Sequence, residues 1–205
     1  MSSSYRPSVS CRIEEAFPAA LRHDVVAVTQ ATSLTEGNGQ FSVLVGGERL
    51  VIPYRVRADA ALLDRAGTHE SVQRDILSCI FSRHYDGRVR ERALRQFVRS
   101  AEDWAVPFVL QLVGEYVIEI HRVIQEALPF LNNSQYAAFL RANPEIYERT
   151  RQRAVSYWSC YYRSGFPAGT GYPAFEVLTQ FDNFLENRAP VRAIGGIREP
   201  RDTRL

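Results

Sequence analysis

Lysine is absent from this sequence. All 25 basic residues of the 205-residue chain are arginines, and the formal net charge is only +2. A charge this small gives no general attraction to polyanions such as nucleic acids. A Walker-type phosphate loop is excluded, because that motif requires a lysine. Two explanations of the arginine bias stay open: codon usage in a GC-rich genome, or selection for the planar, bidentate contacts of guanidinium groups.

Cysteine is scarce as well. The three cysteines, Cys11, Cys79 and Cys160, lie far apart, which is not typical of a disulfide framework or of a zinc site with paired cysteine ligands. The Glu-x-x-His pairs of di-iron bundles do not occur, and neither does the Gly-x-Ser-x-Gly elbow of hydrolases. The sequence therefore predicts a reduced, cytoplasmic protein with no metal and no cofactor.

Long apolar runs are missing. The N-terminal residues 1–17 lack the apolar stretch of a secretory signal. The most apolar segment, 105–120, is interrupted by Gln111, Glu115 and Glu119. It is too short and too polar to span a membrane, so no membrane partner is predicted.

A β-hairpin is predicted over residues 41–56. Apolar residues alternate on both sides of Gly46 and Gly47, and this glycine pair is typical of a two-residue turn. Pro53 cannot donate a hydrogen bond to a neighbouring strand, which places the second strand at an edge or at a bulge. Before the hairpin, between residues 13 and 34, we expect a short helix followed by a strand at 25–29.

After residue 60 the pattern is helical. The predicted helices cover residues 69–83, 88–100, 106–128, 135–140, 144–163 and 174–187. The fold class is therefore α+β and mostly α, with the N-terminal hairpin packed on a bundle of about five or six helices. We expect one domain over residues 13–187, between a flexible N-terminus (1–12) and a flexible basic tail (188–205). The long apolar helix at 106–128 predicts either a fully wrapped central helix or the seam of a homodimer.

Three stretches together resemble a family of bacterial proteins of no assigned activity. They are SRHYDGRVRERAL (82–94), VPFVLQLVGEYVIEI (106–120) and RAVSYWSCYYR (153–163). The resemblance covers residues 70–163 and implies a soluble bacterial protein. It transfers no catalytic residue, because none is established for that family. Residues 69–100 are also similar to a HEAT-like helical hairpin, although one pair does not make an array.

The predicted helix at 88–100 carries a stripe of arginines opposite its apolar face. At about 100° per residue, four of them project within about 60° of one another. These are Arg88, Arg92, Arg95 and Arg99. Such a stripe is typical of a solvated outer face, and an acidic protein partner and nucleic acid are the alternatives. Nucleic acid is disfavoured because the helix has few of the amide and hydroxyl side chains that read bases.

Arg90 projects onto the apolar face of the same helix. An unpaired buried charge costs several kcal/mol, so Arg90 must reach solvent or meet an acidic partner. The following apolar helix carries Glu115 and Glu119 on a narrow polar stripe. Either this stripe faces solvent, or it forms a buried network with Arg90 that sets how the two helices pack. The two carboxylates are also weak candidates for general acid–base catalysis.

Aromatic residues gather on one face of the helix predicted at 144–163. Tyr157, Trp158 and Tyr161 project close together, which is typical of core packing. Tyrosine hydroxyls need water or a partner, so the edge of this face is also a candidate binding surface. The flanking arginines would suit an acidic peptide or a stacked base.

These patterns favour a non-enzymatic bacterial interaction or scaffold protein with an unknown protein partner. One alternative is a nucleic-acid-associated factor that uses the stripe at 88–99. The other alternative is an unrecognised enzyme with a site near Glu115 and Glu119.

Overall fold

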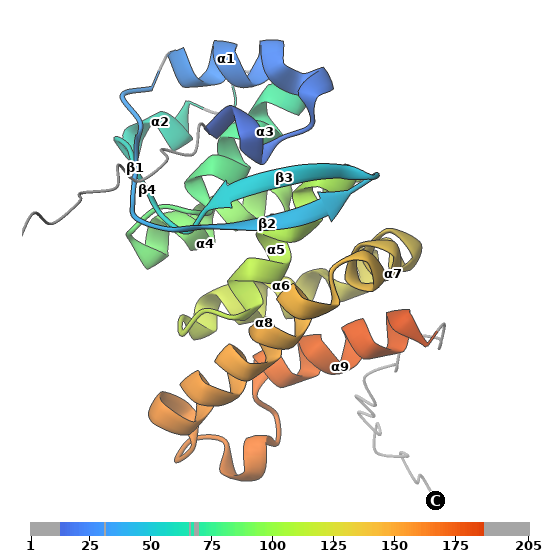
Figure 1. Cartoon of the computed structure of the whole chain (residues 1–205). Coiled ribbons are helices and arrows are strands. Elements are labelled where there is room, and N and C mark those ends of the chain that lie inside the picture. Colours follow the sequence, from blue (N-terminus) through green and yellow to red (C-terminus); the bar gives the residue numbers. More distant parts are fainter. Residues whose placement is uncertain (1–12, 31, 66, 68–69, 187–205) are drawn as a thin grey trace, which may run out of the picture.

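The computed structural model describes residues 13–30, 32–65, 67 and 70–186, and helices dominate this part of the chain (Figure 1). The helices are α1 (Arg22–Gln30), α2 (Ala61–Asp64), α3 (Ser71–Phe81), α4 (Gly87–Phe97), α5 (Val106–Val113), α6 (Ile118–Ala127), α7 (Asn133–Ala142), α8 (Pro144–Tyr157) and α9 (Pro173–Leu185). The strands are β1 (Thr35–Glu36), β2 (Gln40–Val45), β3 (Glu48–Pro53) and β4 (Val56–Arg57). The predicted class, α+β and mostly α, is confirmed. The flexible ends predicted at 1–12 and 188–205 lie outside the described residues.

The predicted hairpin is formed by β2 and β3, which pair antiparallel from Val45 opposite Glu48 to Gln40 opposite Pro53. Gly46 and Gly47 have φ angles of 58° and 85°, which L-residues with side chains rarely adopt. Within the described residues the sheet has only these two strands. Pro53 is therefore on an edge strand, and it pairs with the last residue of the ladder, where its missing N–H group is tolerated.

The strand predicted at 25–29 is wrong, because these residues belong to helix α1. Val25 and Val28 are three positions apart, so in a helix they share one face, and both are buried. This face packs against α3. The β-branched residues thus follow the helical period that tertiary packing imposes, and their strand propensity is overridden.

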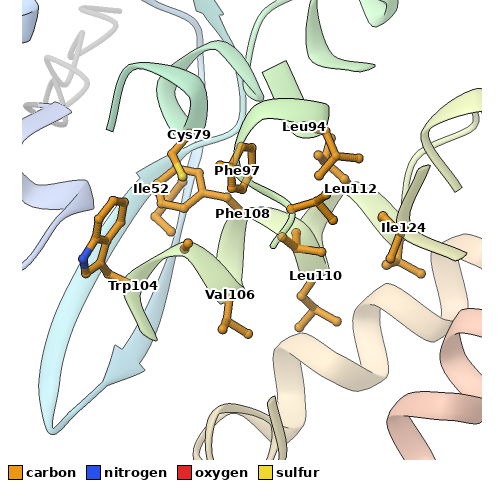
Figure 2. Close-up of a cluster of buried hydrophobic side chains, with 14 of the residues drawn as sticks. Ile52, Cys79, Leu94, Phe97, Trp104, Val106, Phe108, Leu110, Leu112 and Ile124 are labelled. Carbon is orange, nitrogen blue, oxygen red and sulfur yellow. The ribbon is translucent and has the colours of Figure 1, made fainter. Parts of the chain in front are cut away.

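Helix α5 forms the centre of the core, and all eight of its residues are buried. Figure 2 shows the side chains of Phe108, Leu110 and Leu112 pointing to different sides of this helix. Ile52 of the hairpin and Phe97 of α4 belong to the same buried cluster. The residues of one chain therefore surround α5 completely, as predicted for a wrapped central helix. The apolar surface of α5 is not exposed for contact with a second copy.

The continuous helix predicted at 106–128 is wrong. Helix α5 ends at Val113, and α6 begins at Ile118 after a turn in which Val117 is extended, with φ −91° and ψ 105°. Gly114 disfavours helix continuation by about 1 kcal/mol, but it does not forbid it. The turn changes which side chains share a face, because residues before and after it no longer lie on one axis.

The helix predicted from 144 to 163 has the expected extent but not a uniform geometry. Helix α8 is regular to Tyr157, and Trp158–Tyr162 form a π-helical turn. Asp86 caps α4, since its carboxylate accepts a hydrogen bond from the N–H of Arg88 at 2.8 Å. Helices α3 and α4 pack against each other as the expected helical pair.

Candidate functional site

The turn between α5 and α6 carries Glu115, whose side chain is 1% exposed. Three arginines from three parts of the chain contact its carboxylate. The distances to the nearest carboxylate oxygen are 2.8 Å from Nη2 of Arg55, 3.4 Å from Nη2 of Arg90 and 3.5 Å from Nη2 of Arg83. Arg55 lies between β3 and β4, Arg83 follows α3, and Arg90 belongs to α4. We call these four residues the arginine cluster.

The guanidinium groups of the arginine cluster also bind backbone carbonyl groups. Arg55 Nη1 and Arg83 Nη2 donate to the carbonyl of Tyr54 at 2.7 and 2.9 Å. Arg90 Nη1 donates to two carbonyls of the loop between α3 and α4, at 2.8 Å each. The cluster therefore joins the end of the hairpin and the α3–α4 loop to the α5–α6 turn.

The arginine cluster contains three guanidinium groups and one carboxylate. Burial alone would raise the pKa of Glu115, but the charges of Arg83, Arg90 and Arg55 outweigh it and lower this pKa below its usual value. Glu115 is therefore ionised at neutral pH and has no proton to donate. Burial lowers the pKa of Arg83 to about 9, so Arg83 is still charged at neutral pH. The geometry is that of a buried ionic network, and it does not suit general acid–base chemistry.

Of the two alternatives for the polar stripe, the buried network with Arg90 holds for Glu115, and the solvated face holds for Glu119. Glu119 is exposed in the first turn of α6, because the turn after α5 rotates it away from Glu115. Arg55 and Arg83 were missed by the sequence reasoning. Arg55 lies in a loop, where no periodicity places a side chain. The only signal for Arg83 is its position directly after the apolar end of α3.

The arginine stripe is exposed, as its projection predicts, at Arg88, Arg92 and Arg95 of α4 and at Arg99 just beyond the end of this helix. Three of the four contact other side chains, in the pairs Arg92–Asp64, Arg95–Glu91 and Arg99–Phe130. The guanidinium of Arg99 lies 4.0 Å from the centre of the Phe130 ring. Because these charges already have protein partners, the stripe is less available to a phosphate backbone than its arginine count indicates.

Four tyrosines from two segments form an aromatic patch that we call the tyrosine surface: Tyr116, Tyr157, Tyr161 and Tyr162. Tyr116 and Tyr161 are 48% and 64% exposed. The ring of Tyr116 lies 5.8 Å from that of Tyr157 and 6.1 Å from that of Tyr161, between centroids. The hydroxyl of Tyr162 donates to the carbonyl of Tyr116 at 2.5 Å. This bond joins the turn after α8 to the α5–α6 turn, so it fixes the two segments of the patch relative to each other.

The π-helical turn at Trp158–Tyr162 shapes the tyrosine surface. Sequence projection groups Tyr157, Trp158 and Tyr161 on one regular helix, but the structure separates Trp158 from the two tyrosines. Trp158 is half-buried against Phe175, and its indole N–H donates to the carbonyl of Phe166 at 3.0 Å. Tyr161 is left exposed beside Tyr157. Single π-helical turns within α-helices are frequent at functional sites.

A cavity of about 400 Å³ lies beside the tyrosine surface. Its lining residues are Asp86, Gly87, Arg88, Glu91, Tyr116, Val117, Glu119 and Tyr162. The structure thus brings Arg88 of the stripe, the exposed Glu119 and two tyrosines to one place. The cavity is close to the arginine cluster, because a Cβ atom on Gly87 would lie 3.5 Å from Nη2 of Arg90.

A second cavity, of about 370 Å³, lies between β2 and the start of α8. Asn143 is one of its lining residues, and the Asn143 side chain bonds the backbone of Leu44. Its Oδ1 accepts from the N–H of Leu44 and its Nδ2 donates to the carbonyl of Leu44, each at 2.8 Å. Asn143 therefore occupies part of the free edge of β2, as a neighbouring strand would.

Comparisons with protein-family models, with curated proteins and with solved structures found no match for this chain. The resemblance to a bacterial family therefore stays a prediction. Among the described residues, no helix is long and apolar enough to cross a membrane. The same residues contain no group of three or more His, Cys, Asp or Glu side chains that could hold a metal ion.

Proposed function

We propose that this protein is a non-enzymatic interaction or scaffold protein that binds a segment of a partner protein on the tyrosine surface. The observation that carries the proposal is the exposure of Tyr116 and Tyr161 in one patch of touching rings beside a cavity. Tyrosine is enriched in protein interfaces, because its large ring loses little conformational freedom on binding. An adjoining cavity gives a partner side chain a place to insert.

The electrostatics of the site support a binding role over the two alternatives. An enzyme built on Glu115 would need that carboxylate to exchange protons, whereas three guanidinium groups hold it ionised and buried. A nucleic-acid factor built on the stripe would need free guanidinium groups. Three of the four stripe arginines already contact side chains of the protein.

We further propose that the protein acts in a bacterial cytoplasm. The proposal of a bacterial origin rests on the sequence resemblance. Cys79, which is buried, and Cys160, which is exposed, are both free thiols. Free thiols are typical of a reducing compartment, which supports the cytoplasmic location.

Selection of random displayed peptides on the immobilised protein tests the binding role. We expect wild-type protein to enrich a defined set of peptides, and we expect Tyr161→Ser to weaken their Kd at least about tenfold by fluorescence anisotropy. Phe130→Ser is the matched control, because Phe130 is 61% exposed but lies outside the tyrosine surface. Failure to enrich any peptide, or equal enrichment by the Tyr161→Ser variant, would refute the proposal.

A further inference from the structure

The cavity beside the tyrosine surface is negatively charged at its wall. Among the residues that the structure describes, its lining contains three carboxylates, Asp86, Glu91 and Glu119, and one cation, Arg88. Opposite charges in direct contact dominate at such short range, because water and salt weaken more distant interactions. The wall therefore favours a positively charged group over a negatively charged one.

The carboxylates differ in how far the protein itself already uses them. Asp86 accepts a hydrogen bond from the N–H of Arg88, and Glu91 accepts one from Arg95 at 2.9 Å. Glu119 is exposed and makes no ion pair or hydrogen bond with any side chain of the described residues. It lies in the first turn of α6, where the helix dipole stabilises its negative charge. Glu119 is therefore the carboxylate that is free to bind a ligand.

The aromatic part of the cavity selects the same kind of ligand. Tyr116 and Tyr162 line the cavity together with Glu119. The face of an aromatic ring attracts a cation, and this attraction adds to that of a nearby carboxylate. Because the hydroxyl of Tyr162 is bonded to the carbonyl of Tyr116, the two residues hold a defined arrangement before a ligand arrives.

The arginine cluster behind the wall does not reverse this preference. Arg90 lies close to the cavity, because a Cβ atom on the lining residue Gly87 would be 3.5 Å from Nη2 of Arg90. Both Nη atoms of Arg90 are engaged, one with carbonyl groups and the other with Glu115 at 3.4 Å. An anion at the N-terminus of α4 would be repelled by the Asp86 carboxylate, which already caps this helix.

We infer that the cavity receives an arginine or lysine side chain of the partner segment that lies on the tyrosine surface. The inference rests on the proposed function and names the chemistry of its ligand. The cationic head would pair with Glu119, and the apolar stem would pack on the rings of Tyr116 and Tyr162. This contrasts with the acidic peptide that the arginines flanking the aromatic residues had indicated in the sequence.

The peptide selection described above tests the inference when it is run in parallel on wild-type protein and on a Glu119→Gln variant. We expect arginine and lysine to be enriched among peptides selected by wild type and not among those selected by the variant. For one selected peptide, replacing its basic residue with glutamine and introducing Glu119→Gln should each weaken the Kd about fivefold to tenfold. The two changes together should weaken the Kd by less than the product of the two separate fold-changes, because both remove the same contact. Glu126→Gln is the control, because Glu126 is exposed on the same helix but outside the cavity.

The outcomes separate the inference from the proposed function. Peptides that depend on Tyr161 but carry no excess of basic residues, or that bind the Glu119→Gln variant unchanged, overturn the inference and leave the binding role standing. Enrichment of acidic peptides also overturns it, in favour of the arginines on α8. Absence of any peptide binding overturns both.

Discussion

Glu115 is the only acidic side chain of the described residues within ion-pair distance of Arg55, Arg83 and Arg90. Nε and Nη1 of Arg83 and Nε of Arg90 have no hydrogen-bond partner among those residues. The buried arginines therefore depend on one carboxylate for charge compensation. Replacing both sides of such a network with apolar residues can be harmless, but removing one side leaves an uncompensated buried charge.

Glu115→Gln should therefore lower the free energy of unfolding by about 3 to 5 kcal/mol, measured by urea denaturation at neutral pH. Glu119→Gln is the matched control, because Glu119 is exposed, and it should change stability by less than about 0.5 kcal/mol. Equal effects of the two substitutions would show that the arginines find compensation elsewhere.

His121 is a second buried residue whose charge state should affect the stability of the protein. Its ring is fully buried, 5.6 Å from that of Tyr172, and neither ring nitrogen has a hydrogen-bond partner among the described residues. Burial lowers its pKa from 6.5 to about 4. The nearby carbonyls of Glu115 and Val113 counteract this only in part. The folded protein therefore holds this imidazole neutral at pH values where the unfolded chain protonates it.

A folded-state pKa below the unfolded value means that stability falls as the pH falls through this interval. Between pH 6.5 and about 4 the free energy of unfolding should decrease by up to about 3 kcal/mol on account of His121. His121→Phe keeps an aromatic ring beside Tyr172 and should flatten the curve of stability against pH in this interval. An unchanged slope in the variant would exclude His121 as its cause. Glu115 acts separately, at still lower pH, because its own pKa is lowered.

At the scale of elements, β2 exposes an edge that Asn143 partly closes. The side chain of Asn143 binds the N–H and the carbonyl of Leu44, and it also donates to the carbonyl of Phe139 at 2.9 Å. Because these bonds occupy the amide, Asn143 makes no side-chain cap at the start of α8. An uncovered strand edge is a template for pairing with another chain.

Asn143→Ala should destabilise the protein by about 2 to 4 kcal/mol, because it leaves backbone groups of Leu44 and Phe139 without partners. Size-exclusion chromatography should also show concentration-dependent association through the freed edge. Asn143→Asp keeps the acceptor for the N–H of Leu44 but loses both donated bonds, so its stability should be intermediate. A monomeric Asn143→Ala variant at all concentrations would contradict the edge argument.

Local patterns predicted the elements whose cause is local. The turn at the glycine pair and the outward projection of the arginine stripe follow from neighbouring residues, and both were predicted. The break between α5 and α6 does not follow from neighbouring residues. Local crowding at Gly114 does not explain it, because a Cβ atom there would meet only ordinary contacts, at 3.5 Å from Thr150 Cγ2 and beyond. We infer that the turn is held by Glu115 and its distant arginine partners. Such contacts between remote segments cannot be read from periodicity, and Arg55 and Arg83 were missed for the same reason.

At the scale of the whole molecule, the arginine cluster and α5 connect the hairpin, the first helices and the C-terminal helices. Residues from all of these parts belong to one buried cluster. The single domain predicted from the sequence at 13–187 should therefore unfold as one cooperative unit.

Two tryptophans in different parts of the fold allow a test of this cooperativity. Trp104 is buried before α5, with its ring 5.5 Å from that of Phe17, and Trp158 lies in the π-helical turn. In Trp104→Phe and Trp158→Phe variants, the fluorescence of the remaining tryptophan should report the same urea midpoint as far-UV circular dichroism. Separate midpoints within one variant would indicate two independently unfolding parts.

The π-helical turn has an evolutionary consequence. Such a turn corresponds to one residue inserted into an α-helix, and each inserted residue rotates the later part of the helix by about 100°. An ancestral chain without one of the residues at Trp158–Tyr162 would have carried a regular helix, with Tyr161 and Tyr162 facing elsewhere. On this geometry, one inserted codon would be enough to bring Tyr161 and Tyr162 to the side of Tyr116.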